Sequence, residues 1–271
     1  MSNLVQRILT GIVFITLIIG SLWYNFYSAF AVMGLFLLLG LVEYFNLFKD
    51  DQRIQLNGSI NSLLLFSTFL IFGLSLFPSI KPQVVVLVLP IIFISILTEL
   101  WRKKENPIFN IGIVTLGFIY LVIPFSIIIL LSKQSSHEHP YVIGMLLLIW
   151  TNDSFAYLSG RFFGKTKLFE RISPKKTWEG TIGGIVFTLL VAYFISFWSN
   201  QNDLGFWLIA ALLVAPSAIL GDLLESLFKR TLNIKDSGTI LPGHGGILDR
   251  FDATIYTIPF FYTWFIIYTY F

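Results

Sequence analysis

The chain has 271 residues, of which 56% are hydrophobic and only 12% are charged, and its formal net charge at pH 7 is +3. A soluble globular domain usually has about a quarter of its residues charged. The composition therefore indicates an integral membrane protein with little room for a separate soluble domain. The sequence contains no cysteine, which excludes disulfides and thiolate metal sites.

Apolar stretches recur along the whole chain, and a spanning helix needs about 20 mostly apolar residues. In chain order the stretches that qualify are 8–24, 27–48, 59–80, 83–101, 109–131, 141–160, 179–199, 205–228 and 253–271. Arg7 precedes the first stretch, but no small-residue cleavage pattern follows, so we expect this stretch to be retained as a span. The sequence thus predicts an all-α integral membrane protein with about nine transmembrane helices.

Basic residues fall mostly on one side of this expected topology. Nine spans place the termini on opposite sides, and of the 18 lysines and arginines only Lys81 and Lys133 then lie on the C-terminal side. Because cytoplasmic loops are enriched in lysine and arginine, we expect a cytoplasmic N-terminus and an outside C-terminus. We divide the chain into about five N-terminal spans, 1–140, and a catalytic membrane region, 141–271, with cytoplasmic loops 161–178 and 229–252.

Ionisable residues crowd into the segment from Ser226 to Asp252 of a chain that otherwise has few of them. Carboxylates, lysines, arginines and one histidine occur together there. Such a mixture suits a divalent metal ion and phosphate groups far better than it suits lipid.

Two pairs of carboxylates lie at the edges of this segment. Asp222 and Glu225 are three positions apart near the end of the eighth span, and Asp249 and Asp252 have the same spacing before the ninth, so each pair shares a helix face. Two facing pairs would form the oxygen-only site that Mg²⁺ prefers. We expect Asp222 and Asp249 to bind the metal, with Glu225, Asp252 and Asp153 as further candidate ligands. The alternative is ion pairing with Lys229, Arg230 and Arg250.

Two acids in the N-terminal spans are not expected to belong to the metal site, although burying an acid in a membrane span costs free energy. Glu43 and Glu99 lie near the cytoplasmic ends of their helices, close to Lys49 and to the basic run 102–104. We expect interfacial ion pairing or a solvated helix end for both. On the other side of the membrane, we expect residues 137–139, His-Glu-His, to form a solvated loop rather than a metal site.

Loop 161–178 carries the features of a phosphate site. Ser173 followed by Pro174 indicates a helix cap with proline at the first helical position, and Thr177 is the alternative cap. Either way, free N–H groups at a helix N-terminus lie beside Lys175 and Lys176, which favours anion binding. The alternative is a polybasic patch attracted to anionic headgroups, and the two interpretations overlap if the substrate is an anionic lipid.

Glycines in the second loop indicate close backbone approach to a ligand. In His244-Gly245-Gly246 the glycines lack a Cβ and tolerate unusual φ angles. A simple turn explains the same residues equally well. The flanking Lys235 and Arg250, together with His244, favour a ligand.

Residues 226–252 resemble the signature of the phosphatidate cytidylyltransferase family, also called CDP-diacylglycerol synthases. That signature is Ser-x-hydrophobe-Lys-Arg-x4-Lys-Asp-x-small-x2-hydrophobe-Pro/Gly-x-His-Gly-Gly-hydrophobe-x-Asp-Arg-hydrophobe-Asp, and every element is present, with Gly238 at the small position. Asp153, the stretch from Gly160 to Lys165 and the stretch from Ser173 to Gly180 are also similar to the family. The likeness covers residues 150–252 strongly, and the first five spans match by hydropathy alone.

The resemblance implies the reaction CTP + phosphatidic acid → CDP-diacylglycerol + pyrophosphate. It further implies magnesium dependence, a potassium ion beside the magnesium and a homodimer. We expect membrane lipids and no nucleic acid as partners. The distribution of lysine and arginine favours an active site that faces the cytoplasm, in a bacterial cytoplasmic (inner) membrane. In that family the aspartates that match Asp222 and Asp249 hold the metals. We expect catalytic roles for Asp222, Asp249, Lys229, Arg230 and His244, the last as a donor to phosphate rather than a base. Substrate binding is expected from Arg161, Ser173, Lys175, Lys176, Thr177, Lys235, Asp236, Gly245, Gly246 and Arg250.

Two rival functions are consistent with parts of this pattern. A CTP-dependent polyprenol or phytol kinase would transfer the γ-phosphate to an alcohol instead. A membrane transporter would explain the many spans and the intramembrane acids. Against a transporter, the ionisable residues gather at one membrane face and no inverted repeat is visible.

Overall fold

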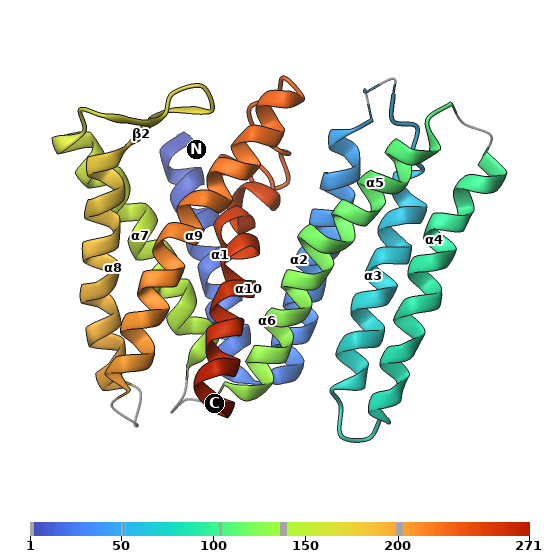
Figure 1. Ribbon diagram of the computed structural model, residues 1–271, viewed down its shortest axis with the longest axis horizontal. Helices are drawn as coiled ribbons and strands as arrows, with labels where there is room; N and C mark the ends of the chain where they lie inside the picture. Colours follow the sequence, from blue (N-terminus) through green and yellow to red (C-terminus); the bar gives the residue numbers. More distant parts are fainter. Residues whose placement is uncertain (1–2, 50, 52, 103–104, 136–139, 199–202) are drawn as a thin grey trace. The chain divides into compact units, whose positions relative to one another are not determined.

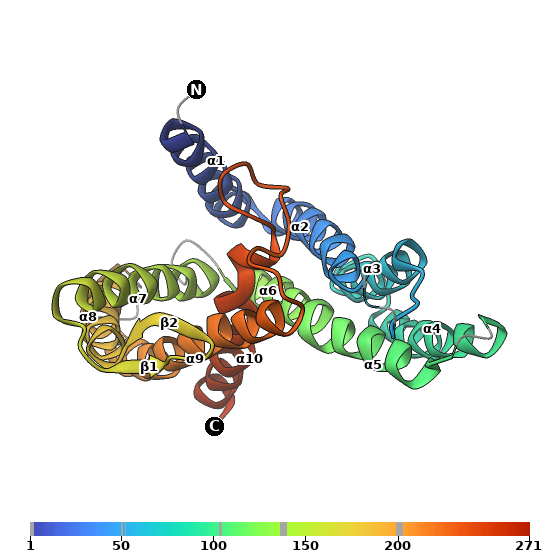
Figure 2. The same cartoon turned by 90° about the horizontal axis from the view of Figure 1, so that it is seen from above.

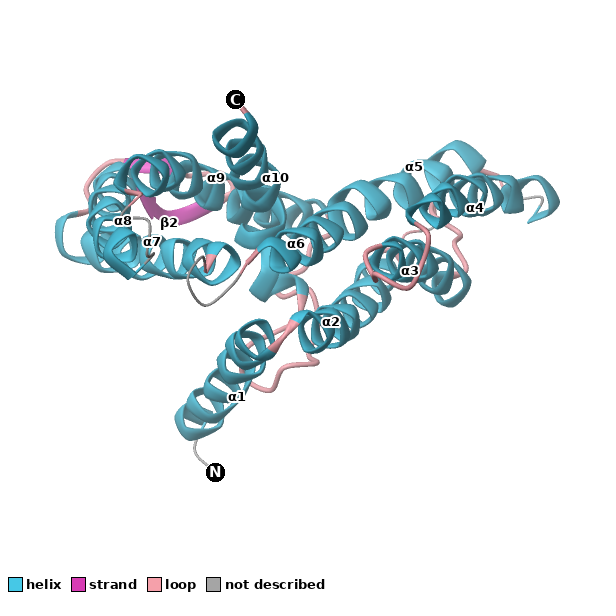
Figure 3. Cartoon of the chain, turned by 90° about the horizontal axis from the view of Figure 1, so that it is seen from below, coloured by secondary structure: helices cyan, strands magenta, loops and turns pink. Residues whose placement is uncertain are grey.

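The computed structural model describes the chain except residues 1–2, 50, 52, 103–104, 136–139 and 199–202 (Figure 1). The expected loop 137–139 and the basic pair 103–104 therefore lie outside the described residues. The helices are α1 (Asn3–Tyr24), α2 (Phe26–Leu47), α3 (Gly58–Ser75), the 3-10 helix η1 (Pro82–Leu87), α4 (Val88–Arg102), α5 (Pro107–Gly117), the π-helix η2 (Phe118–Val122), α6 (Ile123–Gln134), α7 (Tyr141–Phe163), α8 (Trp178–Trp198), α9 (Leu204–Thr231) and α10 (Leu248–Tyr270). Two short strands, β1 (Lys167–Phe169) and β2 (Ser173–Thr177), complete the secondary structure of the described residues (Figure 3).

The prediction of an all-α membrane protein is confirmed. Each of the nine expected stretches overlaps one helical segment, counting η1 with α4 and α5, η2 and α6 together. Within the described ranges, eight of these segments are long and apolar enough to cross a membrane. Helix α10 is not apolar enough to be counted among them, because Asp249, Arg250 and Asp252 occupy its first turns and threonines and tyrosines recur along it.

The chain forms two compact units. The first contains Met1–Leu130 and Asp236–Arg250, and the second contains Leu131–Lys235 and Phe251–Phe271. Residues 236–250 therefore pack with the N-terminal helices, although they follow α9 in the sequence. The expected division of the chain at residue 140 stays a prediction.

Aromatic packing and local caps build the first unit. Asn25 caps α2 by accepting the Ser28 N–H at 2.8 Å, and the Ser28 hydroxyl completes a capping box. Between α2 and α3, the Phe30 and Phe69 rings stack with centroids 5.4 Å apart. Gly73 makes this approach possible, because a Cβ there would lie 2.0 Å from the Phe30 ring.

Buried polar contacts join α4 to the next helix, α5, within the first unit (Figures 1 and 2). Glu99 forms an ion pair with Arg102 at 2.5 Å and accepts a hydrogen bond from the Asn110 Nδ2 at 2.8 Å. Arg102 also donates to the Gln55 carbonyl. The expected ion pairing of Glu99 is confirmed, whereas a solvated helix end is wrong, because Glu99 is only 7% exposed.

Small residues bring α7 and α8 together in the second unit. Gly180 and Gly184 of α8, four positions apart, lie against Ala156 and Gly160 of α7. Small residues at this spacing let the backbones of membrane helices approach closely. A Cβ at Gly180 would lie 2.7 Å from the Ala156 carbonyl oxygen, which is a backbone atom and cannot rotate away. Close approach here therefore depends on glycine.

Helix α9 is packed between other elements of the second unit. Gly144 of α7 lies under Trp207 of α9, where a Cβ would be 2.2 Å from the indole ring. On α10, the Trp264 Nε1–H donates to the Phe206 carbonyl of α9 at 3.0 Å. Gly221 of α9 lies against Asp252 and Tyr256 of α10, so this pair of helices is also closely packed.

The hairpin β1–β2 replaces the expected start of α8 at Ser173. The strands pair antiparallel, with Lys167 opposite Thr177 and Phe169 opposite Ser173, so Ser173 and Pro174 are extended. The expectation of a Ser173 cap with Pro174 in the first helical turn is wrong, because strand pairing satisfies this backbone. The alternative is confirmed: α8 begins at Trp178, and the Thr177 Oγ accepts the Gly180 N–H at 3.2 Å.

We predict that Gly180→Ala lowers the melting temperature of the detergent-solubilised protein, measured by a thermal-shift assay. The added methyl group forces α7 and α8 apart, and overpacking of this kind costs about 1–3 kcal/mol. Gly205→Ala is the matched control, since Gly205 is also in a first helical turn but a Cβ there meets nothing within 4 Å. Its melting temperature should be unchanged or higher, because alanine is the better helix former. Equal melting temperatures for the two variants would contradict the packing assignment.

Candidate functional site

A buried carboxylate organises the segment 236–250, which we call the signature loop. Glu43 of α2 is 4% exposed. Its Oε2 accepts the Ile247 N–H at 2.8 Å, and its Oε1 accepts the Leu248 N–H at 3.2 Å and the Ser237 hydroxyl. Because Leu248 opens α10, this carboxylate satisfies donors at a helix N-terminus. The expectation of interfacial ion pairing or of a solvated helix end for Glu43 is wrong, since the carboxylate is buried and accepts hydrogen bonds from three loop donors.

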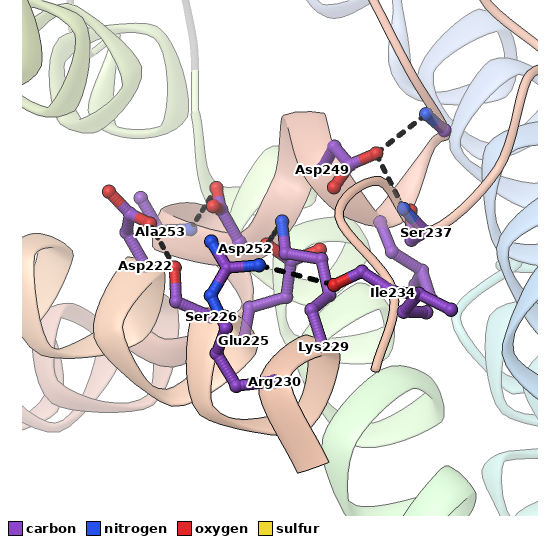
Figure 4. Close-up of polar contacts among 12 residues, drawn as sticks. Asp222, Glu225, Ser226, Lys229, Arg230, Ile234, Ser237, Asp249, Asp252 and Ala253 are labelled. Atoms are coloured by element: carbon purple, nitrogen blue, oxygen red, sulfur yellow. Dashed lines mark hydrogen bonds and ion pairs between the residues drawn. The ribbon is translucent and has the colours of Figure 1, made fainter. Parts of the chain in front are cut away.

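Asp249 also accepts hydrogen bonds from the backbone of the signature loop. Its Oδ2 accepts the Ser237 N–H at 2.9 Å and the Gly246 N–H at 2.8 Å (Figure 4). Ser237 therefore contacts both acids, giving its hydroxyl to Glu43 and its N–H to Asp249. The position of Asp249 is thus defined by backbone donors within the loop.

The glycines of the loop are required by these two carboxylates. Gly245 has a φ of +81°, and a Cβ there would lie 2.5 Å from the Asp249 Oδ2. At Gly246 a Cβ would lie 1.8 Å from the Glu43 Oε1, and at Gly238 2.8 Å from the Glu43 Cδ. The Gly246 N–H is used by Asp249. A role of Gly245 and Gly246 in holding substrate stays a prediction.

Helix α1 packs against the turn that carries His244. A Cβ on Gly243, whose φ is +77°, would lie 2.6 Å from the Arg7 Cγ, and a Cβ on Gly11 would lie 3.4 Å from the His244 Nε2. Partial burial lowers the pKa of His244 below its ordinary value of 6.5, and the positive charges of Arg250 and Arg7 lower it further. The imidazole is therefore mainly neutral at pH 7.

Ion pairs hold the acids at the end of α9 in the second unit (Figure 4). Asp222 pairs with Lys176 of β2 at 2.7 Å, and Glu225 pairs with Lys229 at 2.6 Å. Ser226 donates its hydroxyl to the Asp222 Oδ1 at 3.2 Å. The ion-pair alternative is thus confirmed for Glu225 with Lys229, and the partner of Asp222 is a lysine from the other polar loop.

Further carboxylates act on the same region of the second unit. The negative charges of Glu225, Asp222 and Asp153 all act on Asp252, which is partly buried near the start of α10. The Asp252 Oδ1 accepts its neighbour's N–H, from Ala253, at 2.7 Å. Asp222 remains the more accessible of the ion-paired acids, with 38% of its side chain exposed against 4% for Glu225.

Most of the predicted substrate-binding cations are solvent-facing. Exposed side chains among them are Arg161, Lys175, Lys235 and Arg250, and the substrate-binding candidate Asp236 and the catalytic candidate Arg230 are exposed as well. Arg230 donates to the Ile234 carbonyl at 3.2 Å, which holds the chain as it leaves α9. Ser173 and Thr177 are held in the hairpin and in the cap of α8, so their contribution to substrate binding also stays a prediction.

The structure gathers the predicted residues into two groups, one in each unit. Asp249, His244, Gly245, Gly246 and Arg250 belong to the signature loop. In the second unit, the ion pairs and charges above bring together Asp153, Lys176, Asp222, Glu225, Lys229 and Asp252. Sequence reasoning missed the role of Glu43 in holding the loop and the closeness of Arg7 to Gly243. An acid in an apolar span was the available signal for Glu43, and nothing in the sequence marks Arg7.

Comparison with known proteins identifies the family of the chain. The model of the cytidylyltransferase family matches residues 5–268. The chain belongs to the cytidylyltransferase family. It is 35% identical over 269 residues to the phosphatidate cytidylyltransferase of Bacillus subtilis (strain 168), with 97% of each chain covered. The protein of that name from Rickettsia prowazekii (strain Madrid E) is 38% identical over 225 residues, which cover 80% of this chain and 94% of the relative. The one from Haemophilus influenzae is 41% identical over 175 residues, which cover 60% of this chain and 58% of the relative.

Membership in the cytidylyltransferase family makes the protein a nucleotidyltransferase, and the resemblance of residues 226–252 to that family is confirmed. Reactions of this class usually need a divalent metal ion. Across the described part of the chain, no group of three or more histidine, aspartate or glutamate side chains is arranged to hold a metal. A metal held by fewer carboxylates, together with substrate phosphates, fits what Mg²⁺ commonly does.

We predict that His244 titrates below 6.5 and that Arg7→Ala moves its titration midpoint upward, because one of the opposing positive charges is removed. Since the folded protein lowers this pKa, the unfolded chain binds more protons and stability falls as the pH drops below about 6.5. The measurement is NMR titration of the ring in a His137→Gln/His139→Gln background, which leaves one of the three histidines. Lys81→Ala serves as the control. A midpoint at or above 6.5, or no response to Arg7→Ala, would disprove the assignment.

Proposed function

We propose that the protein is a phosphatidate cytidylyltransferase, which converts CTP and phosphatidic acid into CDP-diacylglycerol and pyrophosphate in phospholipid biosynthesis. The observation that carries this proposal is the match over 97% of both chains to a relative of that name. Within that match, residues 226–252 carry every element of the signature.

The second unit has the donor chemistry that a divalent metal requires. Asp222 presents a partly exposed carboxylate, and the charges of Asp222, Glu225 and Asp153 act together on Asp252. A divalent cation relieves repulsion of this kind, and carboxylate oxygens are the ligands that Mg²⁺ prefers. We propose Mg²⁺ at Asp222 and Asp249, with Asp153, Glu225 and Asp252 as supporting acids and K⁺ as the second ion implied by the family resemblance.

The reaction is a displacement at phosphorus. A phosphate oxygen of phosphatidic acid forms a bond to the α-phosphorus of CTP, and the bond from that phosphorus to the oxygen bridging to the β-phosphate breaks, so pyrophosphate leaves. Bound metal would supply charge neutralisation for the phosphates. The attacking phosphate monoester is already ionised near neutral pH, so a strong general base is hardly needed. Catalysis then depends mainly on positioning and on charge.

The basic side chains of the two polar loops supply the remaining positioning. Lys176 lies 2.7 Å from Asp222, so one ammonium group neutralises the acid and is within reach of a phosphate beside it. Exposed cations for the phosphates of CTP and of the lipid are Arg161, Lys175, Arg230, Lys235 and Arg250, with Lys229 beside Glu225. The neutral ring of His244 acts as a hydrogen-bond donor to phosphate.

The membrane location follows from the two substrates. The tails of phosphatidic acid stay in the bilayer, while its headgroup meets CTP at the surface. We propose that this surface is the cytoplasmic face of a bacterial inner membrane, because the lysines and arginines gather on one side of the expected topology. We also propose a homodimer, which the family resemblance implies. Native mass spectrometry of the purified protein, which measures the mass of the intact assembly, tests this.

Labelled CTP distinguishes this function from a CTP-dependent lipid kinase. With purified protein, phosphatidate and magnesium, we expect label from the α-phosphate of CTP in the lipid product and no transfer of γ-phosphate label. Transfer of γ-phosphate label to a polyprenol or phytol would establish the kinase instead. In sealed vesicles, turnover of added CTP by inside-out but not right-side-out vesicles would support the cytoplasmic site, and flux of substrate without CTP turnover would establish a transporter.

We expect Asp222→Asn and Asp249→Asn each to reduce turnover by about two orders of magnitude or more, because each removes a charge that the reaction needs in place. Normal membrane insertion and an unchanged melting temperature should accompany the loss. The control is Asp51→Asn, since Asp51 pairs with Arg53 at 2.7 Å in the loop after α2 and has no part in the site. Near-normal activity of both site variants at low magnesium would refute the metal assignment.

A further inference from the structure

Glu43 and Glu99 are both buried acids of the first unit, but they have different partners. Glu99 contacts Arg102 and Asn110, which lie in α4 and α5. Glu43 lies in α2, yet its three hydrogen-bond donors come from Ser237, Ile247 and Leu248, roughly two hundred residues later in the sequence. An acid in a membrane helix is costly. Among the residues that the structure describes, the hydrogen bonds that offset this cost come from the signature loop.

Two residues connect Glu43 to Asp249. Ser237 gives its hydroxyl to Glu43 and its N–H to Asp249 at 2.9 Å. Gly246 gives its N–H to Asp249 at 2.8 Å, while its Cα lies so close to Glu43 that a Cβ would be 1.8 Å from the Oε1. Each of the two backbone donors that orient Asp249 is therefore also in contact with Glu43.

We propose that Glu43 is a positioning residue for the transferase reaction and acts by fixing the carboxylate of Asp249 through Ser237 and Gly246. The proposal rests on the proposed function in so far as Asp249 serves that reaction. Glu43 itself touches neither substrate nor reacting atoms. Groups that orient a metal ligand in this way commonly change metal affinity or activity by about 10–100-fold when they are removed.

The role requires a carboxylate and not merely a side chain of this size. Both oxygens of Glu43 accept hydrogen bonds, Oε1 from Ser237 and Leu248 and Oε2 from Ile247. A glutamine amide keeps one accepting oxygen and replaces the other with an NH₂ donor. In Glu43→Gln at least one loop donor would therefore face another donor, and the loop would move away from α2.

The first test compares Glu43→Gln with Glu99→Gln, which alters the other buried glutamate of the unit without touching the loop. We expect Glu43→Gln to raise the magnesium concentration for half-maximal activity and to lower kcat, with a combined effect of about 10–100-fold. Ser237→Ala, which keeps the N–H to Asp249 but loses the hydroxyl, should have a smaller effect in the same direction. The magnesium dependence of Glu99→Gln should match that of the unaltered protein.

A second readout does not depend on activity. The chain has no cysteine, so Ile240→Cys in the signature loop, at a position 41% exposed, gives a single site for maleimide labelling. We expect Glu43→Gln to speed this labelling several-fold and Glu99→Gln to leave it unchanged. Faster labelling in a protein that makes no CDP-diacylglycerol would support the loop contact while refuting the proposed function.

Two results would overturn the inference in a protein that does catalyse the reaction. One is a Glu43→Gln variant whose magnesium dependence and kcat equal those of the unaltered protein. The other is faster labelling with an unchanged magnesium dependence, because Glu43 would then support the loop without positioning Asp249.

Discussion

The signature loop depends on one carboxylate in an apolar helix. Turns and helix starts leave backbone donors unsatisfied, and burial of such donors without partners costs free energy. Glu43 accepts two backbone N–H groups and one hydroxyl from the loop, and Asp249 accepts two more N–H groups. Once two carboxylates lie inside the loop, side chains at 238, 245 and 246 are sterically excluded. The glycines of the signature are therefore a consequence of the acids.

Acids serve a different purpose at the end of α9, in the second unit. Asp222 and Glu225 pair with the lysines Lys176 and Lys229. The charges of Asp153, Asp222 and Glu225 also act on Asp252, so negative charge accumulates around the end of α9. The carboxylates of Glu43 and Asp249 thus shape the backbone of the signature loop, whereas those at the end of α9 create an electrostatic demand for cations. A chemistry of metal ions and phosphates needs both properties.

Much of this could be predicted from the sequence, and the failures have physical reasons. Hydropathy located the helical segments because apolar length is what a membrane selects, and signature residues identified the family. Local rules placed a helix start at Ser173-Pro174, but pairing with β1 made those residues extended and left Thr177 as the cap. The partner of Glu43 was missed because proximity in sequence suggested Lys49, whereas the actual donors lie in the signature loop. Contacts of that range have no local signal.

The hairpin before α8 has a consequence for ligand binding. Its ends are tied, since the Trp178 N–H donates to the Thr166 carbonyl at 3.0 Å and Glu179 accepts the N–H groups of Lys165 and Thr166 at 3.1 Å. The backbone around Lys175 and Lys176 is therefore ordered before any anion arrives. Loss of chain entropy on binding is correspondingly small, and preorganisation of this kind strengthens binding without adding a single contact. Under the proposed role of Lys175 and Lys176 in binding phosphate, this short hairpin favours binding more than a flexible basic loop would.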